Sequence, residues 1–100
     1  MAKTYYADYV NHILRFYFRY DIRKGFKNAV DKANYIAADK VVKKISNAEQ
    51  DLLCAIFSID NINVADNVLA VATRRNEDPT KIWAIVSTTT TKVAKERGLL

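Results

Sequence analysis

Only three of the 100 residues are glycine or proline, namely Gly25, Pro79 and Gly98. An all-β domain of this length needs many tight turns, which depend on those two residue types. Half of the residues are hydrophobic, enough for one core without disulfides or metals. The sequence therefore predicts an all-α fold, in which residues 1–100 form a single compact domain of about five helices.

Apolar residues recur with the helical period in five segments, and residues typical of N-caps precede four of them. Ser46 and Glu49 have the spacing of a capping box, and Asp78 followed by Pro79 is a strong helix start. The predicted N-caps are Asn28, Ser46, Asn63 and Asp78, and the predicted helices span residues 4–20, 28–45, 46–58, 63–75 and 78–97.

The first predicted helix has an apolar stripe wider than one core contact requires. Tyrosines, aliphatic residues and Phe16 form the stripe, and Leu14 and Phe18 widen it. A helix of this kind is covered on two sides, either by its own domain or by a partner. A two-fold dimer would bury the extra arc, so a homodimer through this aromatic helix is one expected assembly.

Several side chains are expected inside the core or outside any reactive site. Val30, Leu69 and Trp83 fall on the inner stripes of their helices, and Cys54 lies in an apolar run typical of a small buried residue. His12 is expected at the surface. With one cysteine and one histidine, the chain is poorly supplied for catalysis or metal binding. We therefore expect no catalytic residue, no metal site and no cofactor.

The sequence carries no signal peptide and no apolar run of membrane-spanning length. A single unpaired cysteine suits a reducing compartment. These features predict a cytoplasmic protein that does not act at a membrane.

Positive charge is concentrated in the first half of the chain. Residues 1–45 contain ten Lys or Arg and four Asp, whereas residues 46–100 contain six Lys or Arg and seven Asp or Glu. This distribution divides the domain into a basic aromatic helical pair (1–45) and a three-helix part (46–100). The basic half is expected to attract a polyanion first. The candidate phosphate contacts are Arg15, Arg19, Arg23, Lys24 and Lys27, with a solvated or acid-paired surface as the alternative.

The aromatic residues of the basic half allow two interpretations. Rings at helical spacing usually belong to a core, and this is the better interpretation for most of them. They are also able to stack on the unpaired bases of a single strand.

Residues 46–98 resemble the helix-turn-helix of sigma-factor region four. The matching segments are residues 49–57 as the supporting helix, 64–75 as the first motif helix and 80–97 as the second. The segments 66–68, 82–83 and 96–100 are also similar to small uncharacterised proteins of prophages and integrative elements. The resemblance implies that the last helix approaches a DNA groove.

The outer face of that last helix carries small, hydroxyl-bearing or basic side chains, which permit close approach to bases and phosphates. It has no Arg, Asn or Gln, the residue types that make the commonest bidentate base contacts, and an ordinary solvated face is the alternative. The candidate contacts there are Thr80, Lys81, Ala84, Ser87, Thr88 and Lys92, with Thr91 and Lys95 on the same face.

These observations lead to two functional hypotheses. The first is a non-enzymatic nucleic-acid-binding or transcription-related accessory protein, encoded by a mobile element, with DNA favoured over RNA. The alternative is a small protein-binding module, such as a phage-type inhibitor or adaptor that acts on a host protein or nucleoprotein. The two differ in whether the basic cluster and the last helix's outer face lie on one side of the molecule.

Overall fold

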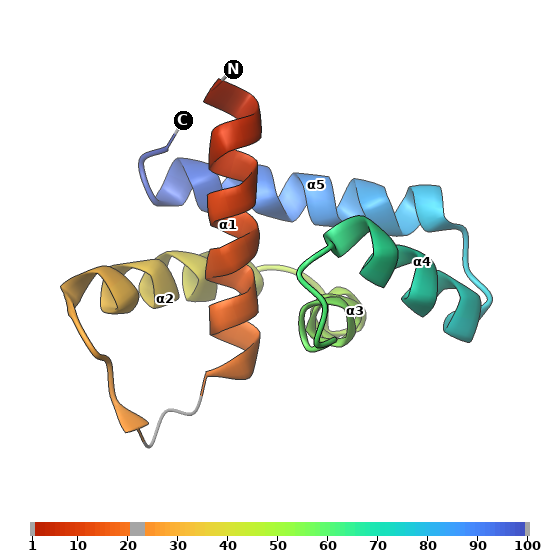
Figure 1. The fold of residues 1–100 in the computed structure, drawn as a ribbon, viewed down its shortest axis with the longest axis horizontal. Helices are drawn as coiled ribbons and strands as arrows, with labels where there is room; N and C mark the ends of the chain where they lie inside the picture. The colour runs from red at the N-terminus through yellow and green to blue at the C-terminus, as the bar shows by residue number, and fades with distance from the viewer. Residues whose placement is uncertain (1, 21–23, 100) are drawn as a thin grey trace.

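The computed structural model describes residues 2–20 and 24–99, with the surroundings of side chains given from residue 7 onward. The described residues contain α-helices and no strand, so the predicted all-α class is confirmed (Figure 1). The helices are α1 (Ala2–Arg19), α2 (Ala29–Val42), α3 (Asn47–Phe57), α4 (Val64–Arg75) and α5 (Pro79–Glu96).

All four predicted N-caps are confirmed by hydrogen bonds from backbone amides. The side chains of Asn28, Ser46, Asn63 and Asp78 accept from an amide two or three residues later, at 2.8 to 3.1 Å. Helix α2 ends at Val42, three residues before the predicted end. The amides of Lys44 and Ile45 donate to carbonyls three residues back, which ends the α-helical pattern before Ser46 becomes extended and caps α3.

Helix α1 crosses both α2 and α5 in Figure 1 and packs against α2, α3 and α5. Helix α5 in turn packs against α2 and α4, so the two halves of the sequence share one core. The largest fully buried side chains of that core are Phe57, Ile13, Leu14, Leu53 and Ile56.

The broad stripe of α1 is covered within the chain. Leu14 is fully buried, and Phe18 packs against the core with its ring stacked on Phe57 at 6.2 Å. The arc that we expected a second copy to bury is therefore occupied by α3. The structure removes the observation on which the predicted homodimer rested.

Several side chains that we expected to be buried are exposed, among them Leu69, which is 55% exposed on α4. Val30 is 52% exposed because the buried residues of α2 lie in its later turns, from Asn34 to Val42. Trp83 is 44% exposed because Ile82 and Val86 face the core and Trp83 lies about 100° round the helix from Ile82. Cys54 is exposed, beside the hydroxyl of Ser58.

Within residues 2–20 and 24–99, no helix combines the length and the hydropathy needed to cross a bilayer.

Candidate nucleic-acid interface

An open depression of about 520 Å³ lies between the C-terminal half of α1 and the segment that leads into α2. We call it the basic depression, because it brings together four of the five predicted phosphate contacts. The fifth, Arg23, lies outside the described residues. The lining consists of His12, Arg15, Phe16, Arg19, Tyr20, Lys24, Gly25, Lys27 and Asp31.

Local sequence explains how these residues meet. His12, Phe16 and Arg19 lie at helical spacing on one face of α1. Gly25 has a φ of +67°, a left-handed conformation that glycine adopts without strain. Asn28 then starts α2. Lys24 and Lys27 lie near Gly25 in the chain and line the depression together with the end of α1.

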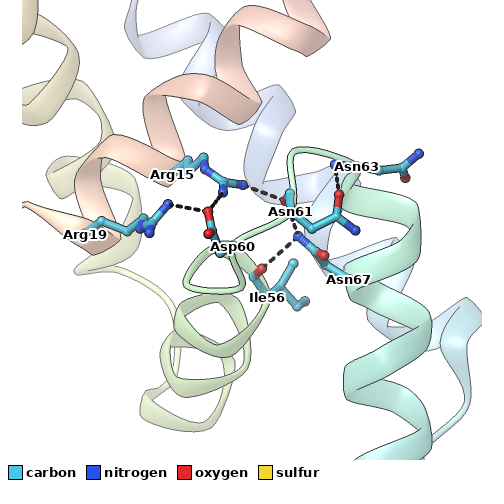
Figure 2. A network of polar contacts seen from close by, with 7 residues as sticks. All are labelled: Arg15, Arg19, Ile56, Asp60, Asn61, Asn63 and Asn67. Carbon is cyan, nitrogen blue, oxygen red and sulfur yellow. Dashed lines mark hydrogen bonds and ion pairs between the residues drawn. The ribbon is translucent and has the colours of Figure 1, made fainter.

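Arg15 ties α1 to the loop between α3 and α4 (Figure 2). Its Nη1 donates to the backbone oxygen of Asn61 at 2.6 Å, and its Nη2 lies 3.6 Å from the Asp60 carboxylate. Its side chain is only 20% exposed. The acid-paired alternative therefore describes Arg15 better than a free phosphate contact does.

The loop that receives Arg15 is held by further polar contacts (Figure 2). The Asn67 amide is buried and donates to the backbone oxygens of Ile56 and Asn61 at 3.2 and 2.9 Å. The Asn61 side chain accepts from the amide of Asn63 at 3.0 Å. Sequence reasoning missed the part that this loop plays, because only the fold brings it to α1.

The other three described cations of the depression form weaker ion pairs than Arg15 or none with the described carboxylates. Arg19 lies 4.0 Å from Asp60, a carboxylate that is itself 94% exposed. Lys24 and Lys27 are exposed and form no ion pair with a carboxylate in the described part of the chain. Exposed pairs contribute about 1 kcal/mol or less, so a phosphate competes easily for Arg19. Asp31 is the one carboxylate in the described lining.

Two half-buried aromatic rings, Phe16 and Tyr20, also line the depression. Their centroids are 5.3 Å apart. Tyr20 is stacked on Phe26 at 5.0 Å and packs against Tyr35 at 4.9 Å. These rings form an aromatic cluster under the basic residues, whereas Phe18 belongs to the core.

The predicted outer face of α5 is accessible. Lys81, Ser87 and Lys95 are exposed, as are Thr80, Ala84, Thr88 and Lys92, while Thr91 is half-buried. Ala84, Thr88 and Lys92 line a shallow hollow together with Ile45 and Glu49, which come from the junction of α2 and α3. No residue of α5 lines the basic depression. In Figure 1 the C-terminal end of α1 lies away from α5, so the two predicted surfaces do not form one site.

A polar cluster between α1 and the C-terminal end of α2 lies outside the lining of the depression. The Tyr17 hydroxyl donates to Asp39 at 2.7 Å, and Lys43 pairs with the same carboxylate at 2.8 Å. The hydrogen bond from Lys43 lowers the pKa of Asp39, and burial raises the pKa of Tyr17. Neither Tyr17 nor Asp39 is among the residues of the basic depression.

Among the residues that the structure describes, no three His, Cys, Asp or Glu side chains gather closely enough to hold a metal ion. Cys54 lies on α3 and His12 on α1, where it lines the basic depression.

No protein-family model matches this chain, and no curated protein or solved structure matches it.

Proposed function

We propose that this protein is a non-enzymatic nucleic-acid-binding protein that holds phosphates in the basic depression. The observation that carries the proposal is the meeting of Arg19, Lys24 and Lys27 around one concave surface. Lysine and arginine that neutralise phosphates supply most of the sequence-independent affinity for nucleic acid. In this proposal Arg15 positions α1 and the α3–α4 loop, and the other three cations contact the ligand.

The resemblance of residues 46–98 to a helix-turn-helix supports a second contact on the outer face of α5, and with it an accessory role in transcription. DNA is the favoured nucleic acid on this resemblance, and a mobile-element origin remains a prediction. The DNA-binding hypothesis expected the basic cluster and the outer face of α5 on one side of the molecule, and this expectation is not met in the described chain. The two contacts therefore require separate tests.

The test is fluorescence anisotropy with labelled random-sequence single-stranded and duplex DNA between about 50 and 300 mM salt. The variant Arg19→Gln/Lys24→Gln/Lys27→Gln removes the cations of the depression. We expect it to weaken binding at low salt and to reduce the slope of log K against log salt by about 2 to 3, since each phosphate contact contributes about 0.7 to 0.9.

Two variants that lose the same charge serve as controls. Lys81→Gln/Lys92→Gln/Lys95→Gln tests the outer face of α5. Lys44→Gln/Arg74→Gln/Arg75→Gln removes three exposed cations that belong neither to that face nor to the basic depression. Equal losses in all three variants would mean that only net charge matters. Absence of binding by the unmodified protein at low salt would contradict the proposal.

A protein-binding function is the second candidate, because one apolar surface is exposed. Leu69 is 55% and Trp83 44% exposed, and together with Ala65 and Pro79 they line a shallow hollow between α4 and α5. Tryptophan is enriched among residues that anchor protein interfaces. A failure to bind either form of DNA would favour this candidate.

A further inference from the structure

We propose that the basic depression receives an unstacked nucleotide of a single strand, with the base against Phe16 and the flanking phosphates on Arg19, Lys24 and Lys27. This inference rests on the proposed function, since it names the form of nucleic acid that the same site takes. It is drawn from the shape of the surface, the arrangement of its rings and the placement of its charges.

The shape of the basic depression suits a group that projects from its partner. The surface is a hollow of about 520 Å³, within the range of about 300 to 1,000 Å³ typical of sites for small organic ligands. A hollow accepts a group that projects from its partner. In a duplex the bases are paired and stacked in the interior of the double helix, so only their edges are accessible in the grooves. An unpaired nucleotide of a single strand projects freely.

The aromatic cluster supports Phe16 as a surface for a base. The ring of Tyr20 is stacked on Phe26 and contacts Phe16, whose plane is tilted from it by 44°, and Tyr35 also packs against it. Phe16 is the outer member of this series, since its ring contact in the described chain is with Tyr20 alone. It is half-buried and lines the depression. A phenylalanine held at the end of a packed series is a fixed platform for one more ring, and every base supplies such a ring.

Positive charge is distributed around Phe16. Arg19 follows Phe16 by three residues on α1, and Lys24 and Lys27 come from the segment beyond it. Cations therefore line the depression from more than one segment. A strand that lays one base on Phe16 has a phosphate on each side of that nucleotide, which matches cations placed around a ring.

The experiment compares a labelled oligothymidylate of roughly 12 nucleotides with a blunt duplex of equal length. A duplex has the higher charge density, so a surface that binds by charge alone prefers the duplex. We expect the single strand to bind more tightly. Equal affinity, or preference for the duplex, would overturn the inference while leaving the proposed function intact. Binding of neither would overturn the proposed function itself.

The matched variants are Phe16→Leu, which keeps an apolar side chain but removes the ring, and Phe26→Leu outside the lining. Phe16→Leu is expected to weaken single-strand binding by about fivefold or more, with the salt slope and duplex affinity unchanged. Phe26→Leu should cause a smaller loss. If Phe16→Leu affected neither ligand, or both equally, the base-stacking role would be wrong. Circular dichroism verifies that each variant is folded.

A crosslinking measurement on the unmodified protein avoids any dependence on the folding of a variant. An oligothymidylate that carries one 5-iodouracil is irradiated in the complex, and the modified peptide is identified by mass spectrometry. The expected adduct lies within residues 16–20. An adduct confined to α5 would contradict the placement of the base in the basic depression.

Discussion

At the scale of single residues, Asn34 shows how a buried polar side chain joins three parts of the fold. It is 5% exposed, its Oδ1 accepts from Arg97 Nε at 2.6 Å, and its Nδ2 donates to the Tyr9 hydroxyl at 3.0 Å. It thereby connects α2 with α1 and with the residue that follows α5. The burial of Asn34 could not be predicted from the sequence, because a pattern of apolar residues does not identify buried amides.

We expect Asn34→Leu to destabilise the fold by about 1 to 3 kcal/mol, since it leaves Arg97 and Tyr9 without their buried partner. The measurement is urea unfolding followed by circular dichroism. Lys32→Leu on the same helix is the control, and as an exposed substitution it should change stability by less than about 0.5 kcal/mol. Equal midpoints for Asn34→Leu and the unmodified protein would contradict this role.

The carboxylate of Asp39 makes stability depend on pH. Its pKa is lowered in the folded protein by the hydrogen bonds from Lys43 and Tyr17, so folding favours its charged form. The stabilisation is complete above the unfolded pKa of about 3.9 and is lost as the pH falls through the lower folded value. Asp39→Asn should therefore cost about 0.5 to 1 kcal/mol at neutral pH and progressively less below about pH 4.

Unfolding by urea between about pH 7 and pH 2.5 checks this expectation. Asp51→Asn on α3 is the control, because this exposed carboxylate makes no ion pair in the described chain. A constant difference between Asp39→Asn and the unmodified protein across the range would show that the Asp39 charge is not responsible.

At the scale of elements, helix starts could be predicted from the sequence and buried faces only in part. A cap is decided within a few residues, so Asn28, Ser46, Asn63 and Asp78 were recognisable. Burial depends on which helices arrive from elsewhere, so Trp83 was misplaced. Four consecutive threonines, residues 88–91, lie in α5, and the buried Thr89 satisfies its hydroxyl within the helix by donating to the Ile85 oxygen at 2.8 Å.

The start of α5 provides a test at this scale. Asp78 accepts from the amide of Thr80 at 2.9 Å, and Pro79 occupies the first helical position. We expect Asp78→Ala to destabilise the protein by about 1 kcal/mol, as loss of an N-cap does elsewhere. Glu77→Ala, one residue before the N-cap, is the control, and thermal unfolding is the measurement. Similar shifts for both variants would show that the effect is one of charge rather than capping.

At the scale of the whole molecule, the cations of the candidate site could be predicted and their surroundings could not. Charge clustering singled out Arg15, Arg19, Lys24 and Lys27. It gave no sign that Asp60 and Asn61 would reach Arg15, because these partners are more than forty residues away in the chain. The separation of the basic depression from α5 likewise follows from the packing of α1 across the other helices.

That packing has a consequence for biosynthesis. Helix α1 precedes the other described helices in the chain, yet it packs against α2, α3 and α5. During translation its apolar stripe has no complete set of partners until α5 has left the ribosome, so the chain cannot fold one segment at a time. Until then the part of the stripe that packs against α5 is open to chaperones and to other nascent chains, and the speed of elongation through residues 20–96 affects the length of that exposure.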